Sequence, residues 1–267
     1  MRNAKPLAAA FVAALLVSSP SSAAPPSSLA RALADPARAA QRGTDARRHP
    51  AELVALADLK PGQRILDLIP GDGYWTRIFS KVVGPKGRVY AVWPQAYARE
   101  AMGNVQQLQA IARQYGNVTV QVQPSNILSA PEPLDVVWTA DNFHDYNDKF
   151  MGSPGSLSLA RAAFHILKPG GLFIVIDHAA APGHGDRDTE SLHRIERTTV
   201  IRQSAAAGFR LVGESQVLRN PKDPLTIKVF DPRVRGHTSQ FALKFRKPLA
   251  EASRDQPAGL SAPRTAL

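Results

Sequence analysis

Hydrophobic positions in this chain recur first with a strand period and then with a helix period, most clearly between residues 63 and 84. An apolar run flanks Asp67, as expected for a strand that is buried on both faces; it consists of Ile65, Leu66, Leu68 and Ile69. Apolar residues at helical spacing follow and predict a helix over Tyr74–Val83. Between them, Gly71 and Gly73 lack a Cβ, so the backbone can turn sharply and approach a ligand.

The same alternation continues to residue 177 and predicts an α/β fold. Strands are expected at Gln63–Ile69, Arg88–Trp93, Val118–Val122, Leu134–Thr139 and Leu172–Asp177. Helices are expected at Tyr74–Val83, about Ala96–Tyr115 and about Ser156–Leu167. Strands and helices that alternate in this way form a mostly parallel sheet with helices on both faces.

The pattern changes after the fifth strand. A helix is expected from about Glu190 to Ala207, followed by strands around Arg210–Val217 and at Gln240–Arg246. Because no helix separates these two strands, we expect them to pair antiparallel at the edge of the sheet. The predicted architecture is therefore a mostly parallel seven-stranded sheet that ends in an antiparallel strand pair.

The two ends of the chain differ in composition from the middle. Residues 1–24 have a basic start, an apolar stretch and small residues at the cleavage position, which is the layout of a secretory signal peptide. This leader predicts a periplasmic or secreted protein; a wrongly assigned start codon would instead leave a cytoplasmic one. Residues 25–50 are expected to form a helical lead-in, residues 51–247 the α/β domain, and residues 248–267 a disordered tail.

Composition narrows the classes of partner. The apolar stretch of the leader is too short to span a bilayer, and no later segment is longer, so no stable membrane span is expected after the leader is removed. The formal net charge is +11, but the basic residues are scattered and not interleaved with aromatic ones, which argues against a nucleic-acid partner. The chain has no cysteine and hence no disulfide framework. Its oligomeric state is left open.

An ordered series of segments carries a resemblance to a known enzyme family. They are D-L-I-P-G-D-G-Y-W-T (67–76), G-P-K-G-R-V-Y-A-V (84–92), D-N-F-H-D (141–145), L-K-P-G-G-L-F-I-V-I-D-H (167–178), L-H-R-I (192–195) and V-F-D-P-R-V-R-G (229–236). With them, about residues 50–247 resemble a class I S-adenosylmethionine-dependent methyltransferase, and more narrowly an exported group of bacterial proteins described as predicted methyltransferases. The resemblance implies a Rossmann-like methyltransferase fold and S-adenosyl-L-methionine as the cofactor.

The resemblance also implies where the cofactor would bind. Asp67 would lie near the methionine end of the cofactor, and Gly71 and Gly73 would line the turn that approaches it. Two positions depart from the family pattern. Ile69 stands where the first glycine of the turn is usual, and Trp93 replaces the acidic residue that hydrogen-bonds the ribose diol.

Other side chains are expected to compensate for the missing acid. Trp93 would stack on the adenine, and Gln95 or Asp72 would reach the ribose hydroxyl groups. Tyr74, Asn126 and Asp141 complete the set of residues that we assign to the cofactor site.

Two polar clusters follow the fourth and fifth strands of the predicted sheet. In open parallel sheets the functional crevice lies beyond the carboxyl ends of the strands. Methyl transfer to a hydroxyl needs an aligned acceptor and a base that removes its proton. Because neutral imidazole titrates near physiological pH, His144 with Asp145, and His178, are the candidate catalytic residues. A hydrogen-bonded structural role is the alternative for each histidine.

Later segments supply candidate substrate contacts. His193 and Arg194 are expected to point from their helix toward the crevice, with a solvated helix face as the alternative. Asp231 and Arg235 lie between the last two strands, where they would shape the substrate pocket or form ion pairs that fix the loop.

One further cluster contains residue types that can bind a metal ion. It comprises His178, His184, Asp186 and His193. Its spacing matches no common zinc pattern, so no metal site is predicted, and the glycine-containing segment within it is interpreted as a lid.

The leading interpretation is an exported methyltransferase that acts on a small molecule or an envelope component. The alternative is a non-catalytic ligand-binding protein on the same fold, because the cofactor is made in the cytosol and Trp93 replaces the ribose acid. A nicotinamide dehydrogenase is disfavoured, since Thr76 stands where its fingerprint needs a third glycine.

Overall fold

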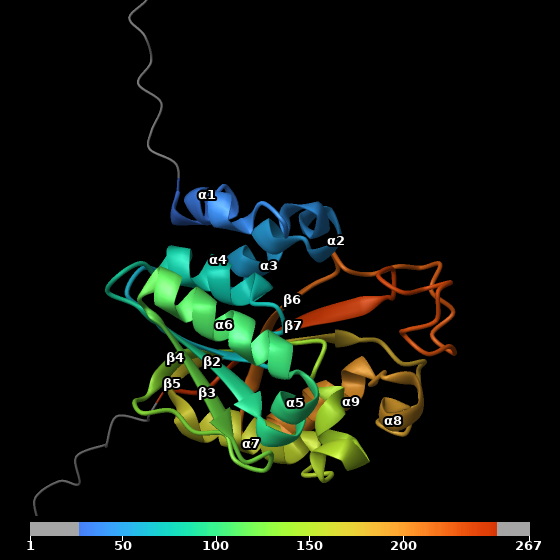
Figure 1. Cartoon of the computed structure of the whole chain (residues 1–267). Helices are drawn as coiled ribbons and strands as arrows, with labels where there is room; N and C mark the ends of the chain where they lie inside the picture. Colours follow the sequence, from blue (N-terminus) through green and yellow to red (C-terminus); the bar gives the residue numbers. More distant parts are fainter. Residues whose placement is uncertain (1–26, 250–267) are drawn as a thin grey trace, which may run out of the picture.

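Seven strands form one mixed sheet at the centre of the protein (Figure 1). The structure is a computed structural model that describes residues 27–249. The strands are β1 (Arg64–Leu68), β2 (Arg88–Pro94), β3 (Val118–Gln123), β4 (Leu134–Ala140), β5 (Leu167–His178), β6 (Arg210–Ser215) and β7 (Gln240–Arg246), in the order β3-β2-β1-β4-β5-β7-β6. Since β7 pairs antiparallel with both β5 and β6, the predicted sheet and its closing strand pair are confirmed.

Helices cover both faces of the sheet. They are α1 (Ser28–Leu33), α2 (Asp45–Arg48), α3 (Pro50–Ala57), α4 (Tyr74–Val83), α5 (Gln95–Glu100), α6 (Met102–Tyr115), α7 (Ser156–Ile166), α8 (Thr189–Leu192) and α9 (Arg197–Ala206). In Figure 1, α4 and α6 lie on one face, over β1, β2 and β3, whereas α7 and α9 lie on the other, beside β5 and β6.

The first strand and helix form as the hydrophobic pattern predicts. Ile65 and Leu66 of β1 are fully buried, as a strand covered on both faces requires. Helix α4 begins and ends at the residues that the helical spacing indicated. Its inner face includes the fully buried Phe79, whose ring lies 5.0 Å from that of Trp138 in β4.

The lead-in packs over α4 and the turn before it. Arg38 is fully buried and pairs with Asp45 at 2.6 Å. The hydroxyl group of Tyr74 donates to the same carboxylate at 2.6 Å, and Gln41 Nε2 donates to the carbonyl oxygen of Asp72 at 3.3 Å. The lead-in thereby fixes the turn that follows β1.

This turn uses left-handed backbone at three positions. Ile69, Gly71 and Gly73 have φ values of 51°, 59° and 80°. A non-glycine residue pays about 1–2 kcal/mol in this region. Ile69 tolerates it because its side chain is buried and its N–H donates to the carbonyl of Val92 at 2.9 Å.

Asp67 lies buried beneath the turn. Thr76 Oγ1 donates to Asp67 Oδ2 at 2.6 Å, so the carboxyl joins the end of β1 to the first turn of α4. Burial raises the pKa of Asp67 to about 7, although the hydrogen bond from Thr76 opposes the shift. In the protein without ligand, Asp67 therefore ties the turn to the first turn of α4.

Two predicted helices are divided in the structure. The helix expected over about Ala96–Tyr115 breaks at Ala101, which separates α5 from α6. The helix expected from about Glu190 breaks at His193, which adopts left-handed backbone with φ 54°. Beyond this break Ile195 pairs with Ala179 in an isolated bridge, and α9 begins two residues later.

Both chain ends extend past the described residues. The predicted leader at 1–24 lies outside them, as does the predicted tail apart from residues 248 and 249. Among the helices within residues 27–249, none combines the length and the apolar character that crossing a membrane requires.

Replacing Gly73 by alanine should destabilise the protein more than the same change at Gly71. A Cβ on Gly73 would lie 2.5 Å from Ile111 Cδ1 and 2.9 Å from Leu108 Cδ1, and both side chains are buried, whereas a Cβ on Gly71 meets nothing within 4 Å. Both positions carry the left-handed strain, so urea denaturation should give losses of about 1 kcal/mol for Gly71→Ala and about 2–3 kcal/mol for Gly73→Ala. Equal losses would contradict the packing argument.

Replacing Asp67 by asparagine should change how stability depends on pH. Because burial raises the pKa of Asp67 from 3.8 to about 7, the folded protein holds a proton that the unfolded chain releases. The stability from this group is complete below about pH 4 and is lost as the pH rises through about 7. Without ligand, the unfolding free energy of the wild type relative to Asp67→Asn should fall by on the order of a few kcal/mol over this range. A difference independent of pH would contradict the raised pKa.

Candidate active site

A single buried carboxylate organises the carboxyl ends of β4 and β5. Asp177 is the last residue but one of β5, is fully buried, and accepts three hydrogen bonds. Oδ1 accepts from His144 Nδ1 and from the backbone N–H of His178, both at 2.7 Å, and Oδ2 accepts from the backbone N–H of His144 at 2.9 Å. Asp177 therefore positions the side chain of His144 and also bonds the backbone of His178.

His144 is the centre of a buried polar cluster. Its Nε2 lies 3.0 Å from Asp145 Oδ1 and 3.3 Å from His193 Nδ1. The hydroxyl group of Tyr97 donates to Asp145 Oδ2 at 2.7 Å. Burial alone would lower the pKa of His144, but the carboxylates of Asp177 and Asp145 outweigh it and hold the pKa well above its ordinary value. A histidine held in this way is a poor proton acceptor.

His178 has a different environment. Its Nδ1 lies 2.8 Å from Thr238 Oγ1 and 3.2 Å from Gln240 Nε2, and its Nε2 lies 3.8 Å from Asp141 Oδ1. Burial lowers the pKa of His178 despite the opposing carboxylates of Asp141 and Asp177. His178 is therefore neutral near pH 7 and is the better candidate base of the two histidines.

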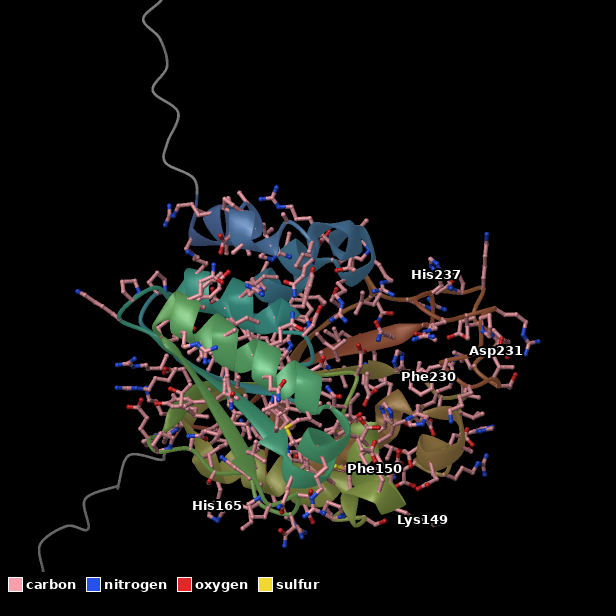
Figure 2. The ribbon with its side chains drawn as sticks, in the orientation of Figure 1. Lys149, Phe150, His165, Phe230, Asp231 and His237 are labelled. Carbon is pink, nitrogen blue, oxygen red and sulfur yellow. The ribbon has the colours of Figure 1, made fainter. Side chains whose placement is uncertain are left out.

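A cavity of about 860 Å³ opens beside His178. Its walls come from residues 46–49 of the lead-in, the ends of β4 and β5, and the long connection between β6 and β7. Figure 2 shows Phe230 and His237 on this connection, on the opposite side of the molecule from His165. The volume lies in the range of small-molecule sites, about 300–1,000 Å³.

The walls of this cavity are strongly basic. Among the described residues, Asp141 is the one acidic residue in the lining, against the basic residues Arg47, Arg48, His49, His178, Arg219, Lys222, Arg233, Arg235 and His237. Arg233 is paired with Asp231 at 2.8 Å. Arg219, Lys222 and Arg235 form no ion pair within residues 27–249. A concave surface lined by one sign of charge attracts ligands of the other sign.

The turn after β1 lies at the same edge of the sheet and suits the cofactor. Gly71 leaves open space beside its backbone, which a close ligand needs. Trp93 is buried, so stacking on adenine would require its ring to move; its Nε1–H has no hydrogen-bond partner within the described residues. The indole N–H is itself buried, so reaching a ribose oxygen would require the same movement of the ring. The residues present therefore fit S-adenosylmethionine.

The predicted site residues fall into several groups. Asp141, His178 and Arg235 line the cavity, and His144, Asp145 and His193 form the adjoining cluster. The turn after β1 and the residues that flank it contain Asp67, Gly71, Asp72, Gly73 and Tyr74. Trp93 is buried in the core.

Other predicted residues lie elsewhere. Arg194 is fully buried and forms a bidentate ion pair with Asp223 at 2.9 and 3.0 Å. It therefore stabilises the fold and does not line the cavity. Asp231 does not line the cavity itself, but it pairs with Arg233, which does. Asn126 is exposed in the turn after β3.

Several side chains at the site were not singled out from the sequence. Tyr97 reaches the buried cluster from α5, and Thr238 and Gln240 reach His178 from the last connection. No motif marks these positions. The adjacent pair Arg47 and Arg48 in the lead-in was the one visible signal for the basic wall.

Sequence comparisons point to methyltransferases. The family model for protein-L-isoaspartate(D-aspartate) O-methyltransferase matches residues 40–127. The ubiquinone/menaquinone biosynthesis C-methyltransferase UbiE of Vibrio cholerae is 30% identical over 176 residues, which are 63% of this chain and 62% of the relative. The Vibrio vulnificus protein of the same name is 28% identical over 174 residues with the same coverage. The chain thus spans about three fifths of the length of these curated relatives.

Solved structures share the fold. A SAM-dependent methyltransferase from Aquifex aeolicus matches with a TM-score of 0.55 and 20% identity over 80% of this chain and 94% of the other. The [4+2]-cyclase SpnF matches with a TM-score of 0.57 and 19% identity over 76% of this chain and 81% of the other. Together, the strand order and the structural matches show that the chain has the fold of class I S-adenosylmethionine-dependent methyltransferases, and the sequence similarities are to enzymes of that kind.

Proposed function

We propose that this protein is an exported enzyme that transfers a methyl group from S-adenosylmethionine to an anionic small molecule or envelope component. The observation that carries the proposal is the basic cavity beside His178 at the carboxyl ends of β4 and β5. The location outside the cytosol rests on the leader at residues 1–24.

Bound S-adenosylmethionine supplies a methyl group on a positively charged sulfur. The turn at Gly71 lets the backbone approach the cofactor, and a movement of the buried Trp93 would bring its indole N–H to the ribose. These residues bind and orient the donor, which is most of what this reaction asks of a protein.

His178 would remove the proton of a hydroxyl or amine acceptor. When its Nδ1–H donates to Thr238 Oγ1, the lone pair on Nε2 is free to accept that proton as the bond from the acceptor to the methyl carbon forms and the carbon–sulfur bond breaks. Asp141, whose Oδ1 lies 3.8 Å from Nε2, would stabilise the imidazolium that results.

The unpaired cations of the cavity would hold the acceptor. Arginine side chains bind carboxylate and phosphate groups with two parallel hydrogen bonds. Arg219, Lys222 and Arg235 come from both ends of the β6–β7 connection, so an anion between them would also join the two halves of this loop.

Titration calorimetry with S-adenosylhomocysteine tests the cofactor site. The full chain is expected to bind one equivalent with a micromolar dissociation constant. Gly71→Ala should weaken this binding at least tenfold, because a methyl group would occupy the open space beside the turn. Gly62→Ala is the matched control, since Gly62 also has positive φ and open space, and it should bind as the wild type does. No heat at millimolar ligand would support the non-catalytic alternative.

Charge reversal at Arg235 tests the class of acceptor. Inorganic pyrophosphate serves as the anionic probe, and thermal shift measures its binding. Arg235→Glu should weaken pyrophosphate binding at least fivefold and leave S-adenosylhomocysteine binding within twofold, because the change lies in the cavity wall. Lys86→Glu makes the same charge change at an exposed site before β2 and should have no effect. Equal weakening in both variants would contradict a built anion site.

A further inference from the structure

Three ligand-type atoms converge in the buried cluster beside the cavity. His144 Nε2 lies 3.0 Å from Asp145 Oδ1 and 3.3 Å from His193 Nδ1, and His193 Nδ1 lies 3.5 Å from Asp145 Oδ1. Metal–ligand bonds of about 2.1 Å place neighbouring ligand atoms about 3.0 Å apart in octahedral geometry and about 3.4 Å apart in tetrahedral geometry. A single ion about 2.1 Å from all three atoms therefore satisfies the triangle.

The groups around the triangle orient each ligand. His144 Nδ1–H donates to Asp177, so once a metal ion displaces the Nε2 proton to solvent, the lone pair of Nε2 faces the other two ligand atoms. Asp145 Oδ2 accepts from Tyr97, which leaves Oδ1 for the same point. Metal-binding histidines usually donate their second ring N–H to a carboxylate, and ligating carboxylates are themselves hydrogen-bonded.

A fourth side chain at the cluster is incompletely paired. Asp148 is 2% exposed, and its Oδ1 has no hydrogen-bond partner within the described residues. Its Oδ2 lies 3.9 Å from His193 Nδ1. A buried carboxylate oxygen without a partner is costly, and a cation beside it removes that cost.

The backbone of His193 is strained. It has φ 54° directly after α8, where a non-glycine residue is uncommon, and this conformation ends the helix. Strained residues of this kind cluster at functional sites. The ring of Phe230 lies 4.9 Å from that of His193, so the cluster adjoins the cavity wall.

We propose that His144, Asp145 and His193 bind a divalent transition-metal ion, with Asp148 as an additional oxygen ligand or a ligand to bound water. Two imidazole nitrogens and one carboxylate oxygen form a donor set that zinc and iron accept. This set shares only His193 with the cluster whose sequence spacing matched no zinc pattern. Its other two members, His144 and Asp145, come from the loop after β4. The proposal does not depend on the identity of the methyl acceptor.

Zinc binding to the full chain tests this proposal. Protein freed of its purification tag and of metal by a chelator is titrated with Zn²⁺ in a calorimeter. The wild type should bind one equivalent, and His193→Ala should weaken the affinity at least tenfold. His193 is the most exposed of the three ligands, so its loss is the least damaging to folding. Circular dichroism and thermal melting check that each variant is folded.

Two further variants separate a metal site from a structural network. His184→Ala removes a partly exposed histidine that pairs with Asp188 at 2.6 Å, outside the cluster, and should bind zinc as the wild type does. Tyr97→Phe frees Asp145 Oδ2 and should weaken zinc binding roughly tenfold, as the loss of an outer hydrogen bond to a ligand does.

The absorption spectrum of bound Co²⁺ distinguishes a metal site from a cluster that only stabilises the fold. Co²⁺ bound by the wild type should show visible d–d absorption bands that are lost in His193→Ala. If the wild type binds no zinc at micromolar concentration, or if His193→Ala keeps the same stoichiometry and affinity, the cluster holds a shared proton and the proposal is overturned.

Discussion

The arrangement of the site depends on the buried carboxylate of Asp177. A charge removed from water is costly unless hydrogen bonds compensate for it. Here the compensation comes from the side chain and backbone of His144 and from the backbone of His178. The loop after β4 is thereby joined to the end of β5, and the position of the His144 ring follows from this one group.

The same carboxylate leaves the two histidines in opposite charge states. His144 lies between Asp177 and Asp145, so its pKa stays well above the ordinary value. The ring of His178 is buried, and this burial lowers its pKa even though the carboxylates of Asp141 and Asp177 oppose the shift. The two histidines therefore have different roles. His178 lines the cavity as a neutral base, and His144 lies in the buried cluster beside it.

Local pattern predicted most of the fold. The boundaries of α4 and β7 match the expected residues because the apolar spacing changes abruptly at each end of these elements. The breaks before α6 and after α8 were not predicted. At His193 the helix breaks where the residue contacts His144 in the loop after β4. These two residues are far apart in the sequence, so a local sequence pattern does not reveal the contact. The burial of Trp93 was missed for the same kind of reason, since an aromatic residue at a strand end can face either the core or a cleft.

By itself, the sequence determined the sheet with its antiparallel edge, the glycine turn after Asp67, and the two strand ends at which His144 and His178 occur. These features follow from local periodicity and from the topology of parallel sheets. Only the tertiary structure decided that the lead-in and the β6–β7 connection close a basic cavity, and that His144, Asp145 and His193 meet at one point. The physical reason is distance along the chain: charges and ligand atoms from segments far apart in sequence act together only where packing brings them together.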